Sequence, residues 1–124
     1  MSKDAPQPLI VVNRIDAAAL EDRVAYFFET MVKFVVDIER ERIALGADLH
    51  ADLEALLLED GSRSEDLWGA NYHPGQGAEA CLEFTSLINI RPSLGNPGME
   101  VADTQLRERL REITFRLIGA GESL

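Results

Sequence analysis

His50 is the residue around which this sequence offers the most chemistry. It lies in the stretch G-A-D-L-H-A-D-L-E at residues 46–54, where Asp48, Asp52 and Glu54 alternate with it at two-residue spacing. An imidazole beside carboxylates can accept and pass on protons, so His50, Asp52 and Glu54 are candidate catalytic residues. No motif of a known catalytic mechanism accompanies them, and the residues therefore name no substrate.

A second histidine joins this set if residues 47–57 form a strand. His73 ends a second alternating segment, and an Asp-Gly turn between the two segments predicts a hairpin. In that register His50, Asp52 and His73 converge, and two imidazoles with a carboxylate suit zinc or another divalent ion. The alternative is a histidine and a carboxylate that only hydrogen-bond to each other, in which case we expect no cofactor.

Three further polar residues are candidates for ligand binding. Asn71, Asn89 and Arg91 belong to the polar face of the expected sheet. The planar guanidinium of Arg91 stands directly before a Pro-Gly loop and suits a carboxylate or phosphate, so a small anionic ligand is one expected partner. The competing role for Arg91 is structural, as a partner of Glu59, Asp60 or the carboxyl end of a turn.

Three strands are expected to position these residues. Apolar and polar residues alternate over residues 47–57, 67–73 and 81–91, which predicts an antiparallel meander with one apolar and one polar face. In this arrangement Leu53 and Ile88 point into the core. His50 and Asn89 would then point away from it. Residues 47–57 are also rich in alanine, leucine and glutamate, which favour a helix, so strand and helix both stay open there.

A long amphipathic helix is expected to cover the apolar face of that sheet. Asp16 can cap its start, Gly46 can end it, and the charged run Glu39–Arg42 would lie on its solvated side. The competing interpretation takes residues 32–38 as a strand, because valine, isoleucine and phenylalanine favour strands. The apolar stripe that favours the helix recurs at steps of four and three residues and consists of Leu20, Val24, Phe27, Met31, Val35 and Ile38.

The two ends of the chain complete an α+β fold. Residues 1–8 are expected to be a disordered tail, and residues 9–121 form a single domain that begins with a short strand at residues 9–12. Asp103 caps a C-terminal helix that packs on one face of the sheet and ends at two glycines. Its apolar stripe consists of Leu106, Leu110, Ile113 and Leu117.

The charge of the chain narrows the classes of partner. There are 22 acidic and 12 basic residues, so the formal net charge of -10 disfavours nucleic acid and anionic membrane surfaces. The sequence shows no apolar run long enough to span a membrane and no secretion signal, so we expect a cytoplasmic protein. The single cysteine, Cys81, agrees with a reducing compartment and is expected to be buried.

Five short motifs cover most of the chain and together resemble one known family. They are V-V-D-I-E-R at 35–40, L-H-A-D-L-E at 49–54, L-L-E-D-G-S at 57–62, L-W-G-A-N at 67–71 and S-L-I-N-I-R-P at 86–92. The sequence is similar to the prokaryotic family catalogued as domain of unknown function 5674. It departs from the family pattern at Ala47, where a second glycine is expected, and at Pro97, where a polar residue is expected. The resemblance implies no activity, cofactor or catalytic residue.

Two functions from different classes remain after these exclusions. The first is a small acidic binding or interaction module that acts as a homo-oligomer, because amphipathic helices and a single-layer sheet leave apolar surface to be covered. The second is a metal-dependent hydrolase that uses His50, Asp52 and His73. Bound metal would distinguish between them.

Overall fold

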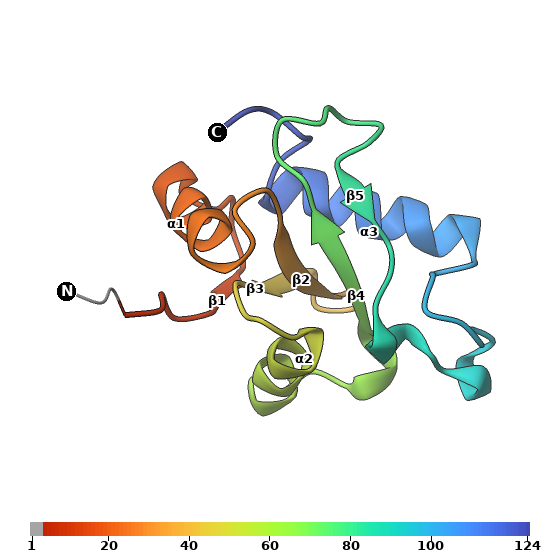
Figure 1. Cartoon of the computed structure of the whole chain (residues 1–124). Coiled ribbons are helices and arrows are strands. Elements are labelled where there is room, and N and C mark those ends of the chain that lie inside the picture. The colour runs from red at the N-terminus through yellow and green to blue at the C-terminus, as the bar shows by residue number, and fades with distance from the viewer. Residues whose placement is uncertain (1–3) are drawn as a thin grey trace.

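The fold is α+β and is built on one five-stranded antiparallel sheet, seen in a computed structural model that describes residues 4–124 (Figure 1). The expected fold class and the C-terminal helix are confirmed, but the sheet has five strands rather than three. Its order is β1-β3-β2-β4-β5, with β1 at Leu9–Val11, β2 at Val32–Asp37, β3 at Arg42–Leu45, β4 at Leu67–Tyr72 and β5 at Leu82–Glu83. Of the tail expected over residues 1–8, residues 1–3 lie outside the described residues.

Helices cover the sheet on both faces, so the molecule has three layers. α1 (Ala17–Phe27) and α3 (Thr104–Leu117) pack on one face, while α2 (His50–Glu59) packs on the other (Figure 1). The first face buries the larger apolar cluster, to which the sheet contributes Phe34 and Val36. The second face buries a smaller one around Leu53 and Leu57 of α2.

The long helix expected over residues 17–45 is wrong beyond Phe27. The chain turns at Glu29, whose φ of 68° lies in the left-handed region, and then enters β2. β2 is the central strand of the sheet and is buried on both faces, so it is a continuous β-branched run rather than an alternating one. The competing interpretation of residues 32–38 as a strand is therefore the one that the structure confirms.

The charged run Glu39–Arg42 forms the turn after β2 and the first residue of β3, and is not the solvated side of a helix. The buried carboxylate of Asp37 accepts hydrogen bonds from the backbone amides of Glu39 and Arg40, both at 2.9 Å. Ser62 donates its hydroxyl to the second oxygen of Asp37 and so joins this turn to the segment after α2. A buried acid that accepts backbone bonds explains why the turn forms at this position.

Residues 47–57, for which strand was the leading prediction, form most of α2 instead. Leu53 and Leu57 are four residues apart and both point at the sheet, which confirms Leu53 as a core residue. His50 lies on the same side and is buried, contrary to the expectation that it points away from the core. The helix-favouring composition of this segment decides its structure, so the predicted hairpin with residues 67–73 does not form.

The strand expected over residues 81–91 is wrong beyond Glu83. β5 pairs with β4 only at Glu83 and Leu82, and the chain then leaves the sheet through 3-10 turns at Leu87–Asn89 and Pro92–Leu94. Asn89 is fully buried rather than turned to solvent, and Ile88 is half-buried against the α2 cluster. The loop over residues 84–102, which we call the asparagine loop, therefore replaces the last predicted strand.

The first and last elements agree with the sequence. β1 forms at the edge of the sheet, and α3 begins after Asp103, whose carboxylate accepts from the backbone amides of Gln105 and Leu106. The stripe of α3 packs on the sheet through buried Leu110, Ile113 and Leu117. Within residues 4–124 no helix combines the length and the apolar character that crossing a membrane requires.

Candidate ligand-binding cleft

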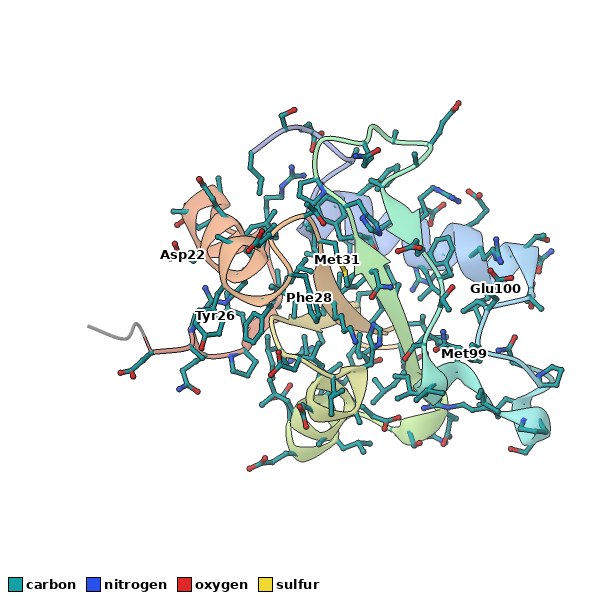
Figure 2. The ribbon with its side chains drawn as sticks, viewed as in Figure 1. Asp22, Tyr26, Phe28, Met31, Met99 and Glu100 are labelled. Carbon is teal, nitrogen blue, oxygen red and sulfur yellow. The ribbon has the colours of Figure 1, made fainter. Side chains whose placement is uncertain are left out.

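A cleft of about 400 Å³ opens where the start of α2 meets the asparagine loop over the sheet. Its floor is formed by Lys33 of β2 and Asn71 of β4, two residues that are directly paired across the strands. Met99, labelled in Figure 2, belongs to the asparagine loop and lines the cleft from that side. The walls are mainly apolar and include Leu49, Ala51, Leu87 and Ile88.

Lys33 supplies a positive charge to the floor of this cleft. It is the only lysine among residues 4–124, and none of the ion pairs in that part of the chain involves it. Its ammonium lies 5.2 Å from the centre of the Phe28 ring, a distance at which a cation is attracted to an aromatic face. The sequence interpretation missed Lys33 because it placed this residue in the long helix expected to end at Gly46, rather than in a strand of the sheet.

His50 is the first residue of α2, and its ring is fixed by a backbone contact. Its Nε2 lies 2.8 Å from the carbonyl oxygen of Ala70 in β4. Because a carbonyl can only accept, Nε2 carries the hydrogen, and Nδ1 keeps its lone pair in the neutral ring. Burial lowers the pKa of His50 below its ordinary value of 6.5 and the charge of Lys33 lowers it further, whereas Ala70 and Asn71 act in the opposite direction. The ring is therefore neutral at pH 7.

Gly69 allows the asparagine loop to approach β4 closely enough to form the cleft. A Cβ at this position would lie 2.7 Å from Cβ of Ser86 and 3.2 Å from Cδ2 of His50. Beyond the end of β5, the side chain of Asn89 takes the place of a neighbouring strand. Its Oδ1 accepts from the Gly69 amide at 2.8 Å, and its Nδ2 donates to the Gly69 carbonyl at 2.9 Å. A glycine inside a strand is the sequence signal for such a close approach.

Asn96 fixes the rest of the asparagine loop and was not predicted from the sequence. Its Nδ2 donates to the carbonyls of Asn89, Gly98 and Glu100, and its Oδ1 accepts from the amide of Ala102 at 3.0 Å. The Pro-Gly composition around it indicated a shaped loop, but composition alone could not show which side chain holds that shape. The candidate ligand residue Asn89 is thus part of the internal framework of the loop.

Glu54 and Arg91 form an ion pair that fastens the asparagine loop to α2. Nη2 of Arg91 lies 2.8 Å from the Glu54 carboxylate, and its Nη1 donates to the carbonyl of Ser64. The guanidinium also lies over the Trp68 ring, 5.4 Å from its centre. The expected pairing of Arg91 with Glu59 or Asp60 is therefore wrong in its partner, and both Glu54 and Arg91 lie outside the lining of the cleft.

The predicted metal ligands His50, Asp52 and His73 do not converge. Successive residues of a helix are turned by about 100°, so Asp52 points to solvent while His50 points to the sheet. His73 follows β4 and pairs with Glu83 of β5. Among residues 4–124 there is no group of three or more histidine, cysteine, aspartate or glutamate side chains that could hold a metal ion.

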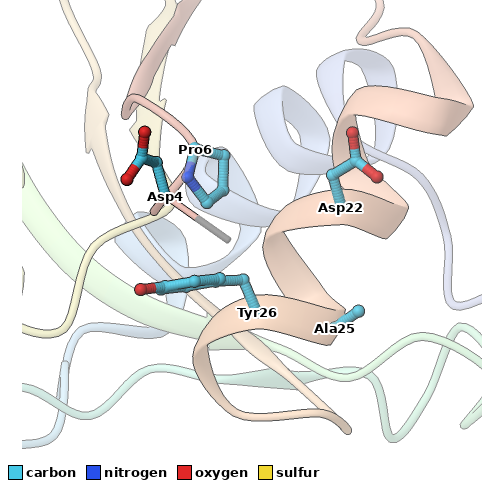
Figure 3. A pocket seen from close by; sticks show the side chains of 5 residues that line it. All are labelled: Asp4, Pro6, Asp22, Ala25 and Tyr26. Atoms are coloured by element: carbon cyan, nitrogen blue, oxygen red, sulfur yellow. The ribbon is translucent and has the colours of Figure 1, made fainter. Parts of the chain in front are cut away.

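A second hollow, of about 320 Å³, lies between the N-terminal segment and α1 (Figure 3). Tyr26 and Pro6 face each other across it, and the carboxylates of Asp4 and Asp22 lie at its sides. Its charges are all negative, so its chemistry is opposite to that of the cleft. None of the residues singled out from the sequence lines this hollow.

Comparison with known proteins places the chain in a family without assigning it an activity. The family described as "Protein of unknown function (DUF5674)" matches residues 9–117, and the chain belongs to it. No curated protein and no solved structure matches the chain. The family predicted from the five sequence motifs is thereby confirmed, and the function has to be inferred from the cleft itself.

Proposed function

We propose that this chain is a binding protein whose cleft beside α2 takes a small carboxylate with an apolar body. The observation that carries the proposal is Lys33, which lines a mainly apolar cleft and whose ammonium has no acidic partner among residues 4–124. A carboxylate would supply that partner. Ligand pockets combine apolar walls with a few polar groups in this way, and about 400 Å³ lies within their usual range of about 300–1,000 Å³.

Local charge favours an anion in spite of the acidic chain. The formal net charge is -10, but no aspartate or glutamate is among the residues that line the cleft. Short-range attraction by Lys33 acts in a partly desolvated site, whereas the charges on the outer surface are screened over about 8 Å at physiological salt. The neutral His50 ring adds polarity to the cleft without adding charge.

The proposal is tested by adding 4-methylpentanoate to ¹⁵N-labelled protein and following the amide resonances. Saturable shifts are expected at Lys33, Asn71, Leu87 and Met99, which line the cleft, and 4-methylpentylamine should not produce them because Lys33 repels it. Lys33→Met keeps the apolar stem and removes the charge, so it should weaken binding about 10- to 100-fold, in line with a charge-assisted contact of about 1.5–3 kcal/mol.

The matched control for this variant is Arg63→Met. It removes the same charge from an exposed side chain that pairs with Glu65 away from the cleft, so binding should change little. Equal weakening by both variants would assign the effect to net charge and contradict a site at Lys33. Absence of saturable shifts in the wild type would contradict the proposal as a whole.

We propose a homo-oligomer as the second function, favoured by exposed apolar side chains of the cleft and of the asparagine loop. Five large hydrophobic residues of this region are exposed by 42–72%, namely Leu49, Leu87, Ile90, Leu94 and Met99. Exposed apolar surface of this kind is typical of interaction sites. Sedimentation velocity at micromolar concentration should show a dimer that Leu87→Ser converts to monomer, and a wild-type monomer at all concentrations would overturn the idea.

A further inference from the structure

Lys33 and His50 are the two side chains of the cleft that can carry a positive charge. Lys33 comes from β2 and His50 from the first turn of α2, and no aspartate or glutamate lines the cleft with them. At pH 7 only Lys33 is charged, because the His50 ring is neutral. The cleft therefore holds one positive charge or two, depending on whether His50 binds a proton.

Other charged side chains near His50 do not line the cleft. Asp48 and Asp52 are exposed beside it in the chain, and Glu100 is exposed in the asparagine loop. Six more form ion pairs within or between the neighbouring elements, namely Glu54 with Arg91, Arg42 with Asp60 and Glu83 with His73. Lys33 is thus the charged group that acts on the His50 ring from within the cleft.

Two oxygen atoms are placed to hold a proton on the His50 ring. Nε2 donates to the carbonyl oxygen of Ala70 at 2.8 Å, and protonation adds a second N–H at Nδ1. The side chain of Asn71 lies beside the ring, and its hydrogen bond favours the protonated form, which raises the pKa of His50. With the ring neutral, the buried Oδ1 of Asn71 has no donor among residues 4–124. Because a ligand cannot reach this buried oxygen, the Nδ1–H group of the protonated ring is the donor that would satisfy it.

Lys33 opposes protonation of the ring. Burial is the main cause that lowers the pKa of His50, and the charge of Lys33 lowers it further. A carboxylate bound at Lys33 would neutralise this charge and would itself attract the protonated ring. By linkage, a ligand that favours proton binding is in turn bound more tightly by the protonated chain.

We propose that binding of a carboxylate at Lys33 is coupled to the uptake of a proton by His50. The inference rests on the proposed function, because it describes how pH regulates the same cleft. The affinity for the carboxylate is lowest above the pKa that His50 has in the complex. It rises as the pH falls through that pKa, and it becomes constant below the pKa that His50 has in the free chain.

The first test is calorimetric titration of the wild-type chain with 4-methylpentanoate at pH 8 and at pH 6. The probe keeps its charge over this range, because free carboxyl groups titrate near about pH 4. The affinity should be about three- to tenfold higher at pH 6, in line with a rise of about one in the pKa of His50 on binding. Titrations in two amine buffers of different ionisation enthalpy should give different heats, because the chain takes up a proton from the buffer.

NMR titration of the His50 ring measures the coupling directly. Saturation with the probe should move the midpoint of the ring titration up by about one pH unit. Lys33→Met should raise the midpoint in the free chain as well, because the opposing charge is gone, and this arm needs no ligand. Arg63→Met removes an exposed charge that pairs with Glu65 away from the cleft, so it should leave the midpoint in place.

His50→Gln removes the titrating ring and keeps a side chain that can donate to Ala70. Only the dependence of affinity on pH is compared in this variant, since His50 lines the cleft and its replacement changes the affinity itself. The rise in affinity between pH 8 and pH 6 should disappear. His73→Gln, which changes a residue outside the cleft, should keep that rise.

The outcomes separate the coupling from the binding on which it rests. Equal affinity of the wild type for the probe at pH 8 and pH 6 would overturn the inference and leave the proposed function standing. An unchanged His50 midpoint in Lys33→Met would also overturn it, since the two groups would then not interact. No binding of the probe at either pH would overturn the proposed function and the inference together.

Discussion

The two faces of the sheet are covered through different kinds of contact. We call the face under α1 and α3 the closed face, and the face under α2 and the asparagine loop the open face. Under α1 and α3 the sheet presents large apolar side chains such as Phe34 and Val36, and the interface is filled. Beside the smaller apolar cluster under α2, the second face of the sheet presents Lys33 and Asn71, and the asparagine loop over them is fixed by amide hydrogen bonds as well as by the packing of Ile88. One face therefore buries the larger apolar cluster, and the other contains an open cleft.

The two faces differ because apolar packing and hydrogen bonding differ in how completely they must fill the space between elements. Apolar packing fills space without direction, so the α1 and α3 face holds its helices at interior density. Hydrogen bonds to backbone groups fix a loop at chosen points and can leave an open space beside them. The loop residues Leu87 and Met99 remain 72% and 42% exposed as a result.

The largest effect is expected from truncation on the closed face. Phe34→Ala removes a fully buried aromatic side chain between the sheet and its helices, and we expect a loss of about 3–5 kcal/mol in the free energy of unfolding. Urea denaturation followed by circular dichroism measures it. A loss below about 1 kcal/mol would mean that this face is not the main source of stability.

A smaller loss is expected from the framework of the open face. Asn89→Ala leaves the amide and the carbonyl of Gly69 without partners, which should cost about 2–4 kcal/mol if each unsatisfied buried group costs about 1–2 kcal/mol, the lower part of the usual range of about 1–3 kcal/mol. Amide hydrogen exchange should accelerate over residues 84–102 and remain slow in α3. Uniform acceleration would instead indicate that the loop and the closed face unfold as one unit.

Lowering the pH should reduce the free energy of unfolding through His50, which lies on the open face. The pKa of His50 is lower in the folded chain than its ordinary value of 6.5, so below about pH 6.5 the unfolded chain binds more protons. The stability due to the neutral ring is complete above pH 6.5 and is lost as the pH falls through the folded-state pKa. His50→Gln should therefore reduce the loss of stability between pH 7.5 and pH 5.5.

His73→Gln is the control for this titration, because His73 follows β4 and pairs with Glu83 of β5 rather than with a residue of the cleft. It should leave the loss between pH 7.5 and 5.5 largely intact. Direct titration of the His50 ring by NMR with a midpoint at or above 6.5 would contradict the assignment of a buried neutral imidazole.

The smallest effect on stability is expected at the rim of the cleft. Leu87 is largely exposed, so Leu87→Ala should change the free energy of unfolding by less than about 0.5 kcal/mol. The same variant should weaken binding of 4-methylpentanoate, since Leu87 lines the cleft. Calorimetric titration and urea denaturation of one preparation separate the two effects, and a large stability loss without a binding change would reverse the interpretation.

Elements with local signals were predictable from the sequence. The Asp103 carboxylate caps α3 through backbone amides two and three residues further along the chain. The apolar stripe that ends at Leu117 recurs at the spacing of a helix and does not fit a strand. β2 was mistaken for helix because a strand buried on both faces has no alternation, and its valines also fit a helical stripe. The asparagine loop was mistaken for strand because its order depends on hydrogen bonds between distant residues, such as Asn89 with Gly69.

The candidate site was predictable in its residue types but not in its grouping. His50 and Asn71 lie together in the cleft, although they were placed on one face by a register that does not form. Lys33 was overlooked because the contribution of one lysine depends on what it faces, and that depends on the pairing of β2 with β4. Glu54 and Arg91 were singled out as separate candidates, whereas the fold pairs them with each other.

The most direct test of the cleft as the binding site is the set of intermolecular NOEs between bound 4-methylpentanoate and the protein. The methyl protons of the probe should give NOEs to Leu87 and Met99, and none to Tyr26 beside the N-terminal hollow. NOEs to Tyr26, or to side chains of α3 on the closed face, would show that the ligand binds elsewhere and would contradict the account.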